Sequence, residues 1–163
     1  MKYKIIQTSW KKSHRKLSEV RRKVFIEEQQ VAEELEWDKY DTECFHILLT
    51  DKKNNAIATG RMKKNGHIGR MAVLKQYRNQ GIGSAILNKL TDIARRNDFS
   101  ELYLHAQTSA IGFYQKHDFI ICSEEFMDAG ILHKTMKKDL SSRLKHSETN
   151  LSSRPQRSVV EGS

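Results

Sequence analysis

A loop with two glycines is the part of the sequence best suited to bind a phosphate group. It reads Arg78-Asn79-Gln80-Gly81-Ile82-Gly83 and stands directly before a helical pattern. The glycines leave backbone N–H groups uncovered, the start of a helix adds positive potential, and the arginine adds a permanent cation. A dinucleotide loop would need a third small residue where Ile86 stands, and the Gly-Lys-Ser/Thr of a P-loop is absent. A plain strand-to-helix turn could carry the same glycines, so the loop alone leaves both interpretations open.

The elements that must position this loop alternate between strands and helices. A helix capped by Ser13 and ending near Gln30 would bury one apolar face, which consists of Leu17, Val20, Val24 and Phe25. A second helix, residues 84–96, follows the loop and also has a clean apolar face. Strands are expected at residues 3–7, 45–50, 56–62, 67–73, 101–105, 119–122 and 131–136, and a short helix at 109–116. This order predicts an α/β fold in which a mixed sheet carries helices on its faces.

The length of 163 residues fits one domain with its own core, which we expect over residues 1–140. Residues 141–163 are rich in Ser, Arg, Asn and Gln and predict a disordered polar tail. No apolar run approaches the roughly 20 residues of a membrane helix. Cys44 and Cys122 lack a paired spacing, so we expect two buried or half-buried thiols, no membrane contact and a cytoplasmic protein.

The formal net charge of +9 raises the question of nucleic-acid binding, because clustered cations release counterions from phosphate backbones. Here the excess positive charge is scattered, and residues 27–43 carry eight carboxylates against the single cation Lys39. No groove-reading motif or zinc-finger spacing accompanies it. We therefore expect no nucleic-acid partner, and expect the charge to serve solubility and attraction for anionic cofactors.

Two motifs in the expected order resemble those of the GNAT acetyltransferase superfamily. Residues 78–83 resemble its pyrophosphate-binding Arg-x-x-Gly-x-Gly, and residues 107–119 resemble its Asn-x-x-Ala-x-x-x-Tyr-x-x-x-Gly-Phe signature. Residues 22–29, 36–38, 104–107 and 129–133 are similar to the YjcF-like or ElaA-like branch of the superfamily. Gln107 replaces the usual asparagine, Gly112 a frequent proline, and His117-Asp118 a usual Leu-Gly. Aspartate tolerates a left-handed turn better than most residues, so Asp118 should keep the chain path.

This resemblance implies a GNAT-type, largely antiparallel sheet whose middle strands, near Met71 and Leu104, splay apart around acetyl-CoA. It implies an N-acetyltransferase in which a primary amine attacks the thioester directly and gives a tetrahedral oxyanion, with the Val73 N–H as its donor. The acceptor would be a small-molecule amine or a protein amino group, and the protein a monomer or homodimer. The implied cofactor contacts are Met71, Ala72, Val73, Arg78, Asn79, Gln80, Gly81, Ile82, Gly83, Ser84, Gln107 and Tyr114.

In the same scheme Tyr114 protonates the departing thiolate, although a tyrosine packed in the core would look the same in the sequence. A general base must keep the amine neutral, and His105, His133 and Glu28 are the candidates. A histidine on a strand can equally be structural, and a glutamate near a helix end can be solvated. The histidines lack the spacing of metal ligands, so no metal is expected.

The acidic stretch, residues 27–43, could draw cationic amines to the acceptor side or could be a solvated loop. Trp37, next to Asp38, could complete an apolar and anionic pocket or could anchor the loop to the core.

The same fold could also serve as a non-catalytic acyl-CoA-binding or regulatory module. A degenerate copy should lose the loop glycines or the tyrosine, and this chain keeps Gly81, Gly83 and Tyr114. The sequence therefore favours the enzyme.

Overall fold

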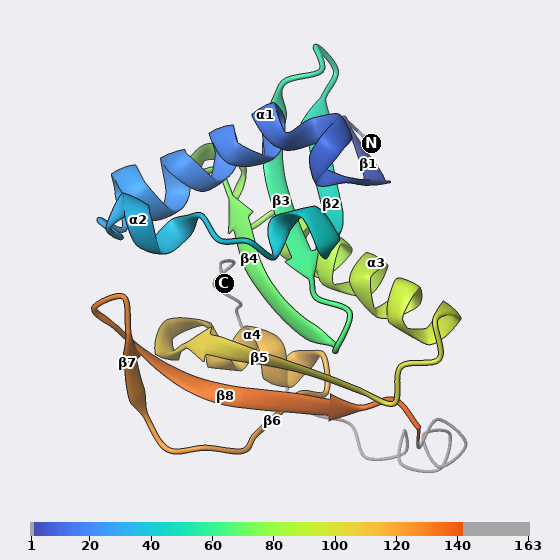
Figure 1. The fold of residues 1–163 in the computed structure, drawn as a ribbon, viewed down its shortest axis with the longest axis vertical. Helices are drawn as coiled ribbons and strands as arrows, with labels where there is room; N and C mark the ends of the chain where they lie inside the picture. Colours follow the sequence, from blue (N-terminus) through green and yellow to red (C-terminus); the bar gives the residue numbers. More distant parts are fainter. Residues whose placement is uncertain (1, 142–163) are drawn as a thin grey trace.

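The strands of the computed structural model, which describes residues 2–141, form one sheet of eight strands (Figure 1). They are β1 (Tyr3–Thr8), β2 (Phe45–Asp51), β3 (Ala56–Met62), β4 (His67–Val73), β5 (Glu101–Gln107), β6 (Ile120–Ile121), β7 (Phe126–Asp128) and β8 (Ile131–Asp139). The order is β1-β2-β3-β4-β5-β8-β6, and β7 also pairs with β8. All neighbours are antiparallel except β4 and β5, which are parallel. The predicted mixed, largely antiparallel sheet is confirmed, and the expected tail beyond Ser141 lies outside the described residues.

Helical segments pack against both halves of this sheet. They are α1 (Trp10–Arg21), the π-helix η1 (Arg22–Glu28), α2 (Glu33–Glu36), η2 (Asp41–Glu43), η3 (Lys75–Tyr77), α3 (Ile82–Arg96), η4 (Thr108–Ala110) and α4 (Ile111–Lys116). Both α1 and α3 contact β3, and every residue of β3 is buried. Because successive side chains of a strand point to opposite faces, the two helices must lie on the two sides of β3.

The first helix begins earlier than predicted. Its N-cap is Ser9, whose hydroxyl accepts a hydrogen bond from the Lys12 N–H at 3.2 Å. Ser13, the predicted cap, lies inside the helix at φ −129° and ψ 17°, where the helix is kinked. The predicted apolar face is correct, since Leu17, Val20, Val24 and Phe25 are all buried.

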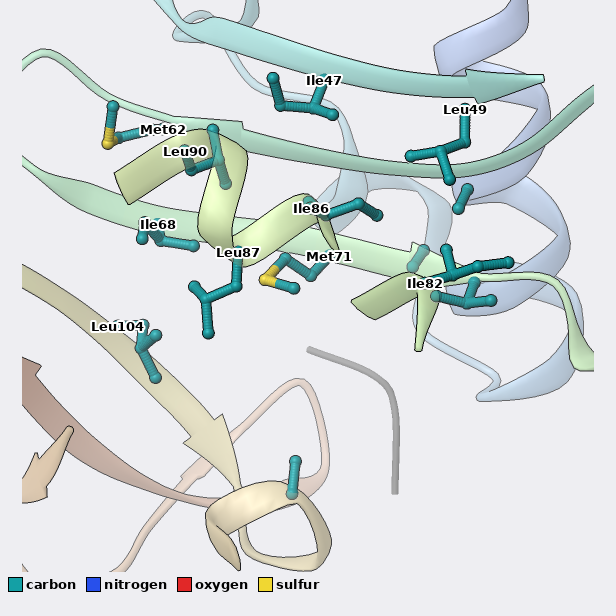
Figure 2. Packing of buried hydrophobic residues seen from close by; sticks show 14 of the residues in the cluster. Ile47, Leu49, Met62, Ile68, Met71, Ile82, Ile86, Leu87, Leu90 and Leu104 are labelled. Carbon is teal, nitrogen blue, oxygen red and sulfur yellow. The ribbon is translucent and has the colours of Figure 1, made fainter. Parts of the chain in front are cut away.

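The core between α3 and the sheet contains Ile82, Ile86, Leu87 and Leu90, which lie against Met71 and Ile68 of β4 (Figure 2). Gly60 on β3 makes this packing possible. A Cβ built on Gly60 would stand 2.6 Å from the Ile86 Cγ2 atom, closer than such atoms ever approach. The missing side chain therefore lets α3 lie directly on β3.

The C-terminal half departs from prediction in two places. The expected strand at residues 119–122 shortens to β6, and Cys122 after it is exposed, although a buried or half-buried thiol was expected. Cys44 is half-buried as predicted. Both thiols are free. The short strand β7 was not predicted, and it pairs with β8 through a turn at Ala129 and Gly130. Asp118 adopts φ 71°, the left-handed conformation expected for it. Within residues 2–141 no helix is both long and apolar enough to cross a membrane.

Candidate active site

The parallel strands β4 and β5 separate soon after they meet. They pair only at His67 with Tyr103 and at Ile68 with Leu104. Figure 1 shows β4 rising away from β5, while β8 stays alongside β5. The predicted splay of the middle strands is therefore confirmed.

A β-bulge in β4 lies at the point where the strands separate. Thr59 of β3 faces Ala72, and Arg61 faces Gly69, so the single residue Gly60 stands opposite two residues of β4. Those two residues are Arg70 and Met71, and Arg70 has a left-handed φ of 51°. A bulge bends its strand and increases the local twist, which accounts for the departure of β4 from β5.

A cavity of about 250 Å³ lies between the separated strands. Ile68, Gly69 and Arg70 line it from β4, and Leu104, His105 and Gln107 line it from β5. The other walls come from η1, α2, Tyr114 of α4 and the β7–β8 hairpin, with Phe25, Gln29, Leu35, Glu36, Asp128 and His133 among the lining residues. Four predicted site residues, His105, His133, Gln107 and Tyr114, thus line one cavity, together with Gln29 and Asp128.

The glycine loop lies outside this cavity and starts α3. Gly81 is the N-cap residue at φ 80° and ψ 8°, and no side chain caps the helix. A Cβ built on Gly81 would meet nothing within 4 Å, so the loop is open on that side. The preceding Asn79 also has a positive φ, 63°. Backbone in alternating conformations before a helix N-terminus forms a concave, positive surface suited to an anion such as pyrophosphate.

Arg78 joins the glycine loop to the end of η1. Its Nη1 and Nη2 atoms donate to the two carboxylate oxygens of Glu28, each at 2.7 Å, and its Nε donates to the Val73 carbonyl at 2.9 Å. The hydrogen bonds from Arg78 lower the pKa of Glu28, which makes this carboxylate a weaker proton acceptor. Glu28 does not line the cavity. The geometry therefore ties it to the loop instead of the acceptor side.

The N–H of Val73 points toward the gap between the strands. Leu74, the next residue, donates its N–H to the Ile57 carbonyl of β3 at 3.0 Å. Bonding groups alternate along an antiparallel strand, so Val73 must direct its own N–H and carbonyl away from β3. The bond from Arg78 to the Val73 carbonyl agrees with this direction.

His133 presents a defined lone pair. It is only 7% exposed, and its Nδ1 lies 2.7 Å from the Ile131 carbonyl oxygen. A carbonyl can only accept, so Nδ1 carries the proton, and in the neutral ring Nε2 is left as the acceptor. His133 lines the cavity, which makes it a geometrically competent proton acceptor.

His105 also lines the cavity, but its tautomer is not fixed. Its Nδ1 lies 2.9 Å from the Thr135 hydroxyl, which can donate or accept. Burial lowers the pKa of His105, and the Asp128 carboxylate partly opposes this. His67, which the sequence analysis missed, stacks on Tyr103 and meets the edge of His105 with ring centroids 4.9 Å apart. The sequence could have indicated this contact. Tyr103 and His105 alternate on one face of β5, and His67 lies on the same face of the neighbouring strand β4.

Tyr114 is both a core residue and a wall of the cavity. It is 2% exposed, and its ring contacts Phe113 and Phe119 with centroids 5.0 and 5.9 Å away. Its hydroxyl lies 3.6 Å from the Met71 sulfur beside the bulge. Burial raises the pKa of Tyr114 above its usual range, so the phenol stays protonated. The raised pKa keeps the proton on the phenol but also makes it a weaker acid, so the case for Tyr114 as a proton donor rests on its position in the cavity wall.

Two further side chains of the predicted cofactor site have partners in the structure. Gln107 donates to the Gln29 side-chain oxygen at 3.0 Å, which joins β5 to the residue that ends η1. The π-helical turn places Gln29 there, since its N–H bonds the Val24 carbonyl five residues back. The Ser84 hydroxyl lies 3.0 Å from the His117 ring nitrogen.

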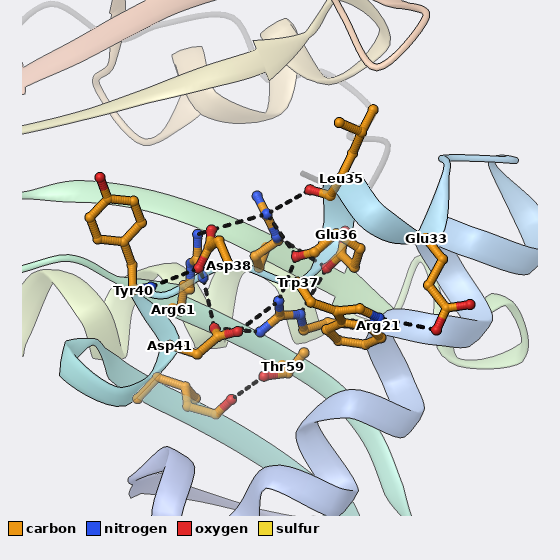
Figure 3. Close-up of polar contacts among 12 residues, drawn as sticks. Arg21, Glu33, Leu35, Glu36, Trp37, Asp38, Tyr40, Asp41, Thr59 and Arg61 are labelled. Atoms are coloured by element: carbon orange, nitrogen blue, oxygen red, sulfur yellow. Dashed lines mark hydrogen bonds and ion pairs between the residues drawn. The ribbon is translucent and has the colours of Figure 1, made fainter.

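Three carboxylates of the acidic stretch are joined in one network with arginines (Figure 3). The network joins Arg21, Arg61 and Arg70 with Glu36, Asp38 and Asp41. Arg21, Glu36 and Asp41 are at most 3% exposed. Glu36, Asp38 and Asp41 are therefore held in an ion network with arginines, whereas the other five carboxylates of the stretch are exposed to solvent.

Trp37 anchors this stretch. The guanidinium carbons of Arg21 and Arg22 lie 5.2 and 5.6 Å from the centre of its ring, and its Nε1–H donates to Glu33. Trp37 does not line the cavity. In the part of the chain that the structure describes, no group of three or more His, Cys, Asp or Glu side chains could hold a metal ion.

Residues 11–140 match the family described as an acetyltransferase (GNAT) domain, and the chain belongs to this family. It is an acyltransferase by this membership, and the resemblance carried by its two motifs is confirmed. Among curated relatives, the N-acetyltransferase YjcF of Bacillus subtilis, whose function is uncharacterised, is 42% identical over 123 residues, 74% of this chain and 88% of YjcF.

Solved structures show the same fold. Escherichia coli ElaA is 24% identical, has a TM-score of 0.73, and is aligned over 85% of this chain and 100% of its own. A GNAT family acetyltransferase from Elizabethkingia anophelis, solved with acetyl-CoA bound, is 18% identical with a TM-score of 0.61, covering 85% of this chain and 99% of that one.

Proposed function

We propose that this protein transfers the acetyl group of acetyl-CoA to a small primary amine by direct attack on the thioester. The observation that carries the proposal is a convergence of groups where β4 leaves β5. A cavity lined by His133 and Tyr114 lies at this point, and Val73 with its gap-facing N–H stands farther along β4. Arg78 donates to the Val73 carbonyl and so links the strand to the glycine loop, where the open helix N-terminus begins at Gly81.

The cofactor would bind from the glycine loop toward the cavity. Residues 78–84 would hold the pyrophosphate with backbone N–H groups at the positive end of α3. The pantetheine arm would follow the free edge of β4 at Met71, Ala72 and Val73, and the amide of Gln107 would face it from β5. The thioester would then reach the cavity, and the N–H of Val73 would stabilise its oxyanion.

The proton transfers are assigned to His133, whose Nδ1 is the hydrogen-bonded nitrogen, and to the phenol of Tyr114. The Nε2 atom of His133 accepts a proton from the acceptor's ammonium group, which leaves a neutral amine. The amine nitrogen attacks the thioester carbon, and the tetrahedral intermediate breaks its carbon–sulfur bond. Tyr114 protonates the departing thiolate, and the proton lost from the new amide nitrogen restores the phenol by way of solvent. His105 would contact the acceptor from the adjoining strand.

The size of the cavity supports a small acceptor, and its wall contains the two carboxylates Glu36 and Asp128 beside the cations Arg61, Lys63 and Arg70. Its volume of about 250 Å³ lies slightly below the roughly 300–1,000 Å³ of ligand pockets. Glu36 in its wall is paired with arginines, whereas Asp128 has no ion pair among the described residues. Asp128 is therefore the carboxylate best placed to attract an ammonium group before it loses its proton.

The test is a panel of primary amines incubated with acetyl-CoA, read by release of free thiol and by mass spectrometry of the product. We expect equal amounts of coenzyme A and N-acetylated amine for at least one small amine. Binding of acetyl-CoA without turnover of any amine would contradict the proposal and favour a non-catalytic acyl-CoA-binding module.

A further inference from the structure

We propose that Arg70 is a positioning residue whose side chain holds β4 in the bulged conformation that opens the active site. This inference rests on the proposed function only for its turnover measurement. Arg70 occupies the bulge, where β4 leaves β5 and the cavity begins. Arg70 combines a left-handed backbone conformation with three side-chain hydrogen bonds at the bulge.

The backbone of Arg70 needs an external restraint. Its φ of 51° lies in the left-handed region, which residues with a Cβ atom seldom adopt. A bulge residue in this conformation is usually glycine. Gly69, its neighbour, does not use the positive φ that glycine could provide. The sequence therefore places the strained conformation on the residue that has a long side chain.

The side chain of Arg70 supplies that restraint. Its Nη2 donates to the Glu36 carbonyl at 2.9 Å and lies 3.3 Å from an Asp38 carboxylate oxygen and 3.4 Å from the Leu35 carbonyl. Its Nε is 3.1 Å from the Glu36 carboxylate, although without the alignment of a hydrogen bond. Figure 3 shows these three acceptors on the segment that crosses over β3 and β4.

The acceptors are themselves fixed. Glu36 accepts from the Nε of Arg21 at 2.8 Å, and Asp38 accepts from two nitrogens of Arg61 at 2.9 and 2.7 Å. Arg21 belongs to α1 and Arg61 to β3, so the bonds of Arg70 connect the bulge to two other elements. Apart from the Nε of Arg70, which makes no hydrogen bond, these side chains are tied to one another by hydrogen bonds and ion pairs, which restrains the acceptors of Arg70.

The bulge also sets the direction of the Val73 N–H. A one-residue change of register turns every later group of a strand to the opposite side. If the bulge were lost, the N–H of Val73 would turn toward β3 and could no longer face a thioester in the gap. Arg70 would thus influence chemistry without touching the reacting atoms.

The test compares Arg70→Ala with Arg70→Gly. Both variants remove the same charge and the same bonds, but only glycine adopts the left-handed conformation without strain. We expect Arg70→Gly to keep kcat within about threefold of wild type and Arg70→Ala to lose roughly 100-fold, the scale of a 1 Å misplacement. Equal losses in the two variants, or no loss in Arg70→Ala, would overturn the inference, because the side chain would then act directly or not at all.

Two additions keep this comparison decisive. Loss of Arg70 leaves the buried Glu36 carboxylate with fewer cations, so both substitutions are also made together with Glu36→Gln, where folding is less at risk. Amide hydrogen exchange at Val73 then reports the bulge without any turnover. We expect wild-type exchange in the glycine variant and altered exchange in the alanine variant, and identical exchange in both would contradict the inference even if the protein acetylates nothing.

Discussion

The stability of the fold should fall between pH 7 and pH 5 because of His67. Burial, followed by the neighbouring His105 and nearby cations such as Lys63, lowers the pKa of His67 from 6.5 to about 4. A group whose pKa is depressed on folding in this way is neutral in the native state. In this pH interval the unfolded chain therefore binds a proton at His67 that the folded chain does not.

The magnitude follows from the two pKa values. The pKa of His67 is 6.5 in the unfolded chain and about 4 in the folded chain. This difference lowers the free energy of unfolding by about 1.8 kcal/mol when the pH falls from about 7 to about 5. His67 is only half-buried, and water screens part of this effect, so we expect about 1 kcal/mol. The loss begins as the pH falls through 6.5 and is complete near 4.

Urea unfolding at pH 7 and pH 5 measures this difference in wild type, in His67→Gln and in His14→Gln. His14 is exposed on α1, so its replacement serves as the matched control. We expect the pH-dependent loss to be smaller by about 1 kcal/mol in His67→Gln than in the other two proteins. The same pH dependence in all three would refute the assignment of a depressed pKa to His67.

Three further substitutions test individual features of the site and the fold. Tyr114→Phe should keep acetyl-CoA affinity while kcat falls by about 100-fold, and a kcat equal to wild type would remove the phenol from the mechanism. Gly81→Leu should abolish the thermal stabilisation by acetyl-CoA, because leucine cannot readily adopt φ 80° or leave the loop open; an unchanged shift would move the cofactor elsewhere. Ala129→Asn should raise the free energy of unfolding by about 0.5–1 kcal/mol in urea titrations, since asparagine tolerates φ 52° better than alanine, and no rise would show that the turn is not strained.

The regular elements could be predicted from the sequence wherever the local pattern was unambiguous. The bounds of β3 and β4 were correct at both ends, because Asn65-Gly66 marks the turn between two β-like runs and Gly66 does adopt φ 92°. The predicted start of α1 was wrong because Ser9 and Ser13 are both residues that commonly cap helices, and the local sequence does not select between them. The strand β7 was not predicted because it has only three residues and because alanine does not indicate the positive φ that Ala129 adopts in the turn before β8.

The candidate site could be predicted only in its sequence-local parts. The glycine loop and the position of Tyr114 follow from short motifs, whereas the bulge depends on an arginine in a conformation that no local pattern indicates. The ion network of Glu36, Asp38 and Asp41 could not be predicted for a similar reason. Their partners Arg21, Arg61 and Arg70 are far apart in the chain, and only the fold brings them together with Glu36 and Asp38.

Whether His133 deprotonates the acceptor can be measured by the rate of amine acetylation by wild type and His133→Gln at saturating acetyl-CoA. Glutamine keeps a polar side chain at this position but cannot accept the proton of an ammonium group at neutral pH. We expect the wild type to form N-acetylated product and the variant to lose about 100-fold or more in kcat, with the thermal shift by acetyl-CoA unchanged. Product formation by His133→Gln at the wild-type rate would contradict the proposal that His133 deprotonates the amine in this cavity.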